Sequence, residues 1–242
     1  MSVTSELLAS ITRCNAVYET NELKARTAFV NMGCAVIGWY STNTAQAAAL
    51  RLADGSYVLC IAGTRVTNSS TAQAASDIWE DAEEIFSNHN LGGGAIVASG
   101  AFARGTEVWN WAKTVFPADA VVNVEGHSLG GQDTHAMLCI MPPSVIGTLT
   151  AWEPPKAGND AFWAQYGAGF LEHYVTTVIN GADPWAAHPW ISHTLRHPPG
   201  PILWLHDSTW SWTTRETWPG GQALHASDHD TDQVMRAVAA CL

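Results

Sequence analysis

Hydrophobic spacing in the first part of the chain predicts two helices followed by a β-hairpin. Apolar residues within 5–31 recur at roughly helical intervals, which indicates two packed helices with a structural role. The apolar runs 45–52 and 57–61 flank Asp54-Gly55, a dipeptide typical of tight turns in which glycine supplies a positive φ. We therefore expect an antiparallel hairpin over 45–61.

Regular and irregular segments alternate between this hairpin and the middle of the chain. Residues 65–75 are small and polar, and we interpret them as a surface loop near the functional site, followed by a short helix over 77–86. Residues 87–100 include three consecutive glycines and are not expected to be regular throughout. Residues 102–116 place apolar side chains on one face of a helix.

Strand signals become denser in the second half of the chain. The β-branched residues in 121–124 predict a strand, and 132–141 favours a helix that Pro142-Pro143 ends. Further strand-like runs cover 145–152, 173–179 and 202–205. Alternating strands and helices predict an α/β protein with a largely parallel sheet, in a single domain that spans residues 1–242.

The charge balance narrows the class of partner. The chain carries 22 acidic and 11 basic side chains, for a net charge of −11. Without a basic cluster, this composition argues against nucleic acid or an anionic membrane surface as a partner. A neutral substrate fits better, and the sequence leaves the oligomeric state open.

Neither a targeting segment nor a metal-binding cysteine pattern is evident. Residues 1–14 lack a basic region followed by a continuous apolar one, and the sequence contains no run of about 18 apolar residues. We expect no stable membrane insertion, and a chain that is cytoplasmic as written or secreted if it is a processed form. The five cysteines include no C-x-x-C pair, which favours buried free thiols over a zinc site or a disulfide framework.

The segment Gly-His-Ser-Leu-Gly at 126–130 places Ser128 in a sharp turn between a predicted strand and a predicted helix. Glycines on either side of the serine let the strand and helix approach without Cβ clashes, so that the hydroxyl projects into a cleft. At the start of the helix, the N–H of Leu129 can face a developing oxyanion. Ser128 is the candidate nucleophile, and Leu129 is a candidate for the oxyanion hole.

A serine hydroxyl is not nucleophilic at neutral pH, so a histidine must take its proton and a carboxylate must orient that histidine. In α/β-hydrolases these residues follow one another in the order serine, acid, histidine. Asp183 comes after the apolar run 175–179, and Pro184 favours an extended backbone at this aspartate. Asp183 is therefore the candidate acid, and Asp207, which also follows a predicted strand, is the alternative.

The candidate base lies near the C-terminus. Asp228 or Asp230 can cap a final helix, which leaves His229 on the approach to that helix. His225 is the local alternative. The cluster of histidines and aspartates in 225–232 could also be a metal site, but it lacks the helical i, i+4 histidine pair of a zincin, and we predict no metal.

Several segments together resemble the class 3 lipase family of α/β-hydrolases, from about Leu59 to the C-terminus. The elbow Gly-His-Ser-Leu-Gly-Gly is similar to that of the family, and Ile-Ala-Gly-Thr at 61–64 resembles the strand that ends in its oxyanion residue. Other matching segments are Asp-Ile-Trp-Glu-Asp at 77–81, Pro-Pro-Lys-Ala-Gly-Asn-Asp at 154–160 and Asn-Gly-Ala-Asp at 180–183.

The resemblance implies an α/β-hydrolase fold, with a mostly parallel central sheet and helices on both faces. It implies that Ser128, Asp183 and His229 form the catalytic triad. Thr64 and the Leu129 N–H would form the oxyanion hole, and no cofactor would be needed.

The chain departs from the family pattern at three places. Ala62 stands where the family usually has arginine, so another group must supply what that arginine supports. Glu125 stands at a place that is usually small or neutral, and we interpret it as a hydrogen-bonded strand carboxylate rather than a catalytic one. The lid region, 65–76, lacks an apolar face, which argues against strong activation at a lipid interface.

Twelve tryptophans are an unusually large number for this chain length. Those between the candidate acid and base are Trp185, Trp190, Trp204, Trp210, Trp212 and Trp218. Most are expected in the core, and one or two could bound an acyl or aromatic ester pocket.

The sequence thus predicts a carboxylic ester hydrolase, an esterase or lipase, that acts on small-molecule or lipid esters through an acyl-enzyme. Two alternatives stay open. The same triad could serve an acyltransferase, and the fold could belong to a non-catalytic lipid-binding protein.

Overall fold

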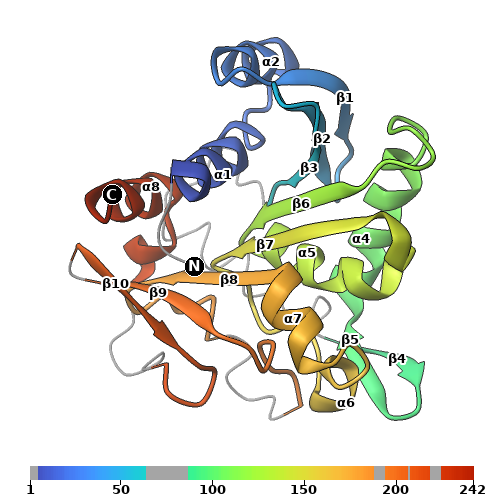
Figure 1. Ribbon diagram of the computed structural model, residues 1–242, viewed down its shortest axis with the longest axis vertical. Helices are drawn as coiled ribbons and strands as arrows, with labels where there is room; N and C mark the ends of the chain where they lie inside the picture. The colour runs from blue at the N-terminus through green and yellow to red at the C-terminus, as the bar shows by residue number, and fades with distance from the viewer. Residues whose placement is uncertain (1–4, 64–86, 188–193, 207, 219–224) are drawn as a thin grey trace.

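An eight-stranded sheet forms the centre of the computed structural model, which describes residues 5–63, 87–187, 194–206, 208–218 and 225–242 (Figure 1). Its strand order is β1-β2-β3-β6-β7-β8-β9-β10. These strands are β1 (Ala35–Ser41), β2 (Gln46–Arg51), β3 (Tyr57–Ile61), β6 (Val122–His127), β7 (Ile146–Trp152), β8 (Val175–Asn180), β9 (Ile202–His206) and β10 (Thr209–Thr213). The five consecutive strands from β3 to β9 pair in parallel, and the remaining pairs at both edges are antiparallel.

Helices cover both faces of this sheet, as the sequence predicts (Figure 1). Alternate residues of β3 enter opposite hydrophobic clusters, because successive strand side chains point to opposite faces. Leu59 and Ile61 pack in the cluster that includes α4 and α5, whereas Val58 and Cys60 pack in the cluster that includes α2. The helices are α1 (Ser5–Ala16), α2 (Glu22–Asn31), α4 (Ser99–Ala112), α5 (Leu129–Ile140), α6 (Asp160–Trp163), α7 (Ala168–Tyr174) and α8 (Thr231–Ala240), with short 3-10 turns at Pro143–Val145 and Ala226–His229.

The predicted N-terminal helices and the hairpin are confirmed. Strands β2 and β3 pair antiparallel, and Gly55 in their turn has a φ of 89°. The strand expected over 173–179 begins only at Val175, since His173 and Tyr174 complete α7. The helix predicted over 77–86 lies outside the described residues.

Four strands were not predicted from the sequence. β1 and β10 lie at the two edges of the main sheet, and β4 (Asn88–Gly92) pairs with β5 (Ala95–Ala98) in a separate two-stranded sheet. The glycines that argued against regular structure in this segment occupy the turn instead, where Gly92, Gly93 and Gly94 all have positive φ. The segment is therefore a hairpin around a glycine turn.

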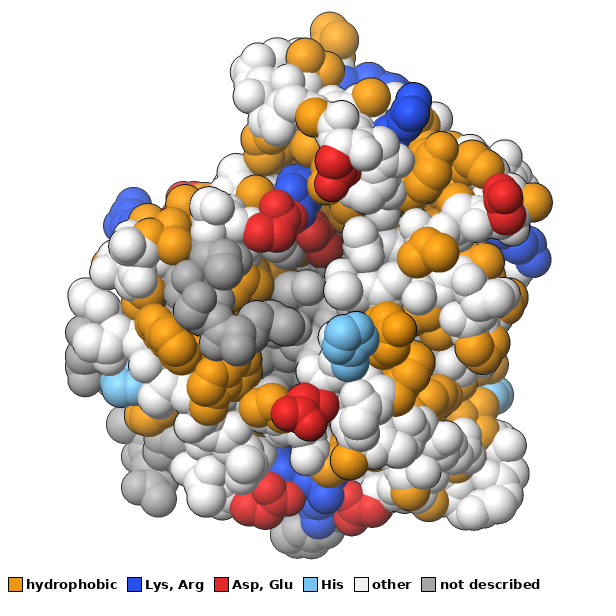
Figure 2. Space-filling model, in the orientation of Figure 1, with side chains coloured by type: hydrophobic (Ala, Val, Ile, Leu, Met, Phe, Trp, Pro, Cys, Tyr) orange, Lys and Arg blue, Asp and Glu red, His pale blue; other side chains and the backbone are white. Residues whose placement is uncertain are grey.

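The charged side chains on one face of the molecule and the state of the cysteines can be compared with the expectations from composition. On the face shown in Figure 2, charged side chains of both signs are scattered in small groups among polar and hydrophobic ones. All five cysteines are free, and Cys14, Cys34 and Cys60 are buried, as expected. None of the helices in the described part of the chain is both long and apolar enough to span a bilayer.

Candidate active site

Three adjacent parallel strands bring the candidate residues together. Ser128 directly follows β6, and Asp183 lies just beyond the end of β8. Because β6, β7 and β8 are neighbours and parallel, their carboxyl ends meet at one edge of the sheet. Residues far apart in the sequence thereby become neighbours at this edge.

The turn at Ser128 is the strained elbow that the sequence predicts. Ser128 has φ 61° and ψ −128°, a backbone conformation that residues other than glycine rarely adopt. A Cβ on Gly126 would lie 2.1 Å from the Gly130 carbonyl oxygen, and one on Gly130 would lie 2.3 Å from the Ile61 carbonyl oxygen. Only glycine fits at these two positions, which confirms the packing argument made from the sequence.

A continuous chain of hydrogen bonds joins Ser128, His229 and Asp183. His229 Nε2 lies 2.8 Å from Ser128 Oγ, and His229 Nδ1 lies 2.9 Å from Asp183 Oδ2. Since a carboxylate only accepts, Nδ1 carries the ring proton, which leaves the Nε2 lone pair to accept the serine O–H. This is the tautomer that a general base requires.

The Asp183 carboxylate is completely buried yet ionised. Its Oδ1 accepts the backbone N–H of Trp185 at 2.8 Å, while Oδ2 accepts from His229. Burial by itself raises the pKa of a carboxyl group, but the charge of His229 and the accepted hydrogen bonds outweigh it and lower the pKa of Asp183. The aspartate is therefore a stable partner for an imidazolium.

Asp228 ties the loop of the candidate acid to the loop of the candidate base. Its Oδ2 accepts the Ala182 N–H at 2.9 Å, and its backbone carbonyl accepts from Asn180 Nδ2 at 3.0 Å. A Cβ on Gly181, where φ is 53°, would lie 2.2 Å from Asp228 Oδ2. Asp230, not Asp228, caps α8, through the Asp232 N–H. These contacts fix the backbone on both sides of the His229–Asp183 bond.

His127, next to the candidate nucleophile, holds the backbone of His229. Burial and the charge of His229 lower the pKa of His127 to about 3, so this ring is neutral at physiological pH. Its Nε2–H donates to the His229 carbonyl at 2.9 Å, and its Nδ1 therefore accepts the Tyr18 O–H at 2.8 Å. Tyr18 Oη in turn accepts the Gly63 N–H at 2.9 Å.

The candidate oxyanion hole is described only in part. Leu129 is the first residue of α5, so its N–H has no acceptor within the helix and is placed beside Ser128. Thr64 lies outside the described residues, as does the lid region 65–76. Gly63, which precedes Thr64, is described and is anchored by Tyr18.

The alternatives weighed from the sequence have different outcomes. Asp207 lies outside the described residues. His225 is 66% exposed, and its Nδ1 lies 3.7 Å from Asp228, whereas the hydrogen bond to Ser128 comes from His229. His225 therefore lies apart from the hydrogen-bonded chain.

One group of side chains in the described part of the chain is compact enough to hold a metal ion. Ligand atoms of Glu153, Asp183 and His229 lie within 4.8 Å of one another. Hydrogen bonds to Asp183 and Ser128 already engage both nitrogens of His229. The geometry therefore favours proton transfer over coordination.

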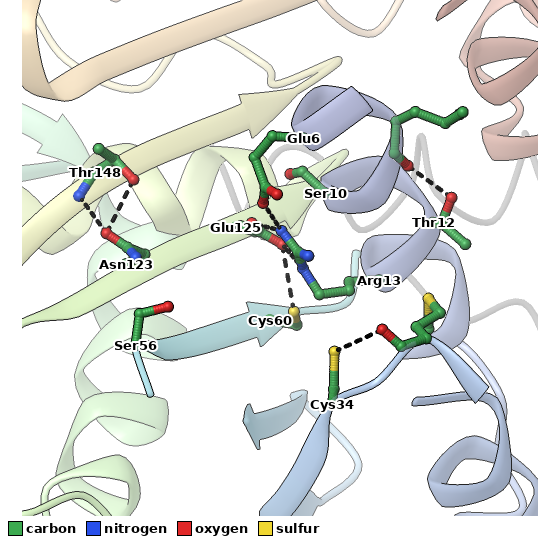
Figure 3. A network of polar contacts seen from close by, with 12 residues as sticks. Glu6, Ser10, Thr12, Arg13, Cys34, Ser56, Cys60, Asn123, Glu125 and Thr148 are labelled. Atoms are coloured by element: carbon green, nitrogen blue, oxygen red, sulfur yellow. Dashed lines mark hydrogen bonds and ion pairs between the residues drawn. The ribbon is translucent and has the colours of Figure 1, made fainter. Parts of the chain in front are cut away.

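Glu125 is a structural carboxylate, paired with an arginine from α1 (Figure 3). Arg13 Nε and Nη2 donate to its two oxygens at 2.9 and 2.6 Å, and both side chains are buried. Arg13 also bonds Glu6. The sequence analysis expected a hydrogen-bonded strand carboxylate here, and its partner is Arg13 of the N-terminal helix.

Comparisons with known proteins give structural matches only. No model of a known protein family matches the chain, and no curated protein matches its sequence. Among solved structures, the chain is similar to a triacylglycerol lipase from Penicillium expansum, with a TM-score of 0.52 and 14% identity over 85% of this chain and 82% of that one. It is also similar to M37 lipase, with a TM-score of 0.55 and 14% identity over 81% of this chain and 76% of that one.

The chain has an α/β-hydrolase fold. On this fold, sequence reasoning missed three residues near the elbow: Tyr18, Arg13 and Glu153. Tyr18 and Arg13 belong to an N-terminal segment whose periodicity indicates only packing. Glu153 had one available signal, a charged residue at the end of the apolar strand β7, directly before a proline.

Proposed function

We propose that this α/β-hydrolase-fold protein is a carboxylic ester hydrolase that uses Ser128, His229 and Asp183 as its catalytic triad. The observation that carries the proposal is the continuous hydrogen-bonded chain, with contacts of 2.8 and 2.9 Å, from the serine through the histidine to the buried aspartate. Its geometry and tautomer suit proton abstraction from the serine hydroxyl.

In the proposed reaction, His229 Nε2 takes the proton as Ser128 Oγ attacks the ester carbonyl. The Leu129 N–H, together with Thr64 as the family resemblance implies, would donate to the oxyanion of the tetrahedral intermediate. The imidazolium, stabilised by Asp183, then protonates the leaving alcohol, and an acyl-enzyme remains. Water, activated by the same histidine, releases the acid.

Neutral acyl esters are the proposed substrates, either small molecules or lipids. The two similar structures carry the word lipase in their names, and the motif resemblance to class 3 lipases supports the same chemistry. The ring of Trp185 lies 5.8 Å from that of His229, centroid to centroid. Its apolar surface beside the triad suits an acyl or aromatic group.

Hydrolysis of short p-nitrophenyl esters by the purified protein tests this proposal. We expect wild-type turnover, and a loss of about a thousandfold or more in kcat for Ser128→Ala, because only binding and the oxyanion hole would remain. Ser56→Ala, in the turn between β2 and β3, is the matched control and should keep full activity. A Ser128→Ala protein with even a tenth of wild-type turnover would contradict the proposal.

A further inference from the structure

Glu153, directly after β7, occupies a strained and fully buried position. Its φ of 49° lies in the left-handed region, which is unfavourable for residues other than glycine, and the residue is 0% exposed. Its N–H donates to the Val178 carbonyl at 2.9 Å, which holds the residue against β8. Backbone strain of this kind is often found at functional sites, and here it holds a buried acidic side chain beside the candidate triad.

One carboxyl oxygen of Glu153 is paired with the backbone, and the carboxyl group lies close to that of Asp183. Oε1 accepts the Asn180 N–H at 2.5 Å. Oε2 is buried and, within the part of the chain that the structure describes, has no hydrogen-bond partner. The carboxyl groups of Glu153 and Asp183 are close neighbours, with an oxygen of each within 4.8 Å of the other.

A hydrogen bond between two carboxyl groups requires a proton on one of them, and the surroundings place it on Glu153. Asp183 accepts from His229 Nδ1 and from the Trp185 N–H, and these bonds favour its ionised form. Burial raises the pKa of Glu153 well above its ordinary value, and the negative charge of Asp183 acts in the same direction.

The other ionisable groups around Glu153 and Asp183 are compatible with a proton on Glu153 and a charge on Asp183. The carboxylate of Asp228 also raises the pKa of Glu153. His127 and His197 lie near enough to Asp183 for its charge to affect their pKa values. Burial nevertheless lowers these pKa values to about 3 and about 4, so both rings are neutral at physiological pH. His229 is bound to Asp183 through Nδ1, whereas its contact with Ser128 uses the other ring nitrogen, Nε2.

We propose that Glu153 is a positioning residue of this site, which stays protonated and donates its carboxyl O–H to the Asp183 carboxylate. The inference rests on the proposed function, in which Asp183 orients His229. With this additional donor, three groups orient the Asp183 carboxylate: the Trp185 N–H of its own loop, His229, and Glu153 at the end of β7. The proton stays on Glu153 throughout the reaction.

Infrared spectroscopy at pH 8 tests the protonation directly, without reference to activity. At this pH Asp133, whose pKa burial raises to about 6, is ionised and does not interfere. We expect a C=O stretching band of a protonated carboxyl group in the wild-type protein, and its loss in Glu153→Gln. A wild-type spectrum without this band at pH 8 overturns the proposal.

Kinetics of three variants test the positioning role. Glu153→Gly removes the carboxyl group and relieves the positive φ, and Glu153→Leu removes it at similar volume; we expect each to lower kcat about 10- to 100-fold, as for loss of a hydrogen bond to a buried charge. Glu153→Gln keeps both an acceptor for Asn180 and a donor for Asp183, and should restore most of this loss.

The pH profile separates a neutral Glu153 from a charged one. The acidic limb of kcat/KM reports protonation of the catalytic base. An amide in place of a neutral carboxyl leaves its midpoint unmoved, whereas loss of a negative charge so close would shift it by about one pH unit. Such a shift in Glu153→Gln, or full kcat in Glu153→Gly, overturns the proposal. Absence of ester hydrolysis in a wild-type protein that shows the infrared band overturns the proposed function instead.

Discussion

Two residues of the candidate site, Ser128 and Glu153, have positive φ and lie at the ends of neighbouring strands. At each, the backbone adopts an unfavourable conformation, and the surrounding contacts fix it there. For Ser128 these contacts include the glycines of the elbow, and for Glu153 they include hydrogen bonds from and to β8. At both residues, the strained backbone fixes the position of a polar side chain of the candidate site.

At the residue scale, separate replacement of His229 and of His225 discriminates between the two candidate bases. We expect His229→Ala to lower kcat about a thousandfold or more, nearly as far as Ser128→Ala, because both remove the same proton transfer. The Ser128→Ala/His229→Ala double variant should be hardly worse than either single variant, since residues that act as a unit are non-additive.

His225→Ala is the matched control for this pair and should keep most of the activity, because its side chain is 66% exposed and lies outside the hydrogen-bonded chain. Steady-state kinetics on a p-nitrophenyl ester provide the measurement. The assignment of the base fails if His225→Ala loses activity and His229→Ala keeps it.

Among the elements, those with strong hydrophobic periodicity could be predicted and those stabilised by long-range contacts could not. β6, β7 and α5 follow from their β-branched or helical patterns. β10 is an edge strand rich in tryptophan, serine and threonine, and it forms because β9 pairs with it. In the same way, Asp183 and His229 could be chosen from chain order, whereas the partners of Glu125 and Glu153 depend on which elements meet in space.

Helix α1 shows how an element with a predicted structural role also supports the site. Arg13 inserts a buried guanidinium that pairs with Glu125 of β6, three residues before Ser128. We expect Arg13→Met to destabilise the protein by about 3–5 kcal/mol, because it leaves the glutamate buried without its partner. Urea unfolding at pH 7 measures this change.

Two controls test whether the unpaired charge is the cause. Arg13→Met/Glu125→Leu should recover much of the lost stability, since replacing a buried ion pair by apolar side chains is often neutral. Glu6→Gln, which removes the 69% exposed partner of Arg13, should cost less than about 1 kcal/mol. A double variant as unstable as Arg13→Met would argue against the charge explanation.

For the whole molecule, burial of neutral histidines links stability to pH. His135, in α5, is fully buried, and burial followed by the charge of His197 lowers its pKa from 6.5 to about 3. Between these values the unfolded chain binds more protons than the folded one, so the contribution of His135 to stability falls as the pH drops through this window.

We therefore expect His135→Phe to gain stability relative to wild type by roughly 1 kcal/mol for each pH unit below 6.5, on top of a constant offset from the lost bond to Thr177. Urea unfolding of both proteins at pH 8 and pH 5 gives the comparison. A stability difference that is the same at both pH values would refute this assignment.

The whole fold also explains why the site forms. Parallel pairing of β6, β7 and β8 brings the candidate nucleophile, Glu153 and the candidate acid to one edge. The 3-10 turn Ala226–His229, just before α8, places His229 between Ser128 and Asp183. The sequence supported this architecture through its alternation of strands and helices. The role of Thr64 in the oxyanion hole falls on a residue outside the described part of the chain and, like the roles of the triad residues, stays a prediction.

Labelling with a fluorophosphonate probe tests the central claim most directly, because the reagent reacts with a serine only when a neighbouring base activates it and fluoride can leave. Wild-type protein is treated with the probe and the modified residue is identified by peptide mass spectrometry. The account predicts a single stoichiometric adduct on Ser128, none on Ser128→Ala, and much slower labelling of His229→Ala. A wild-type protein that stays unlabelled, or a Ser128→Ala protein labelled as readily as wild type, would contradict it.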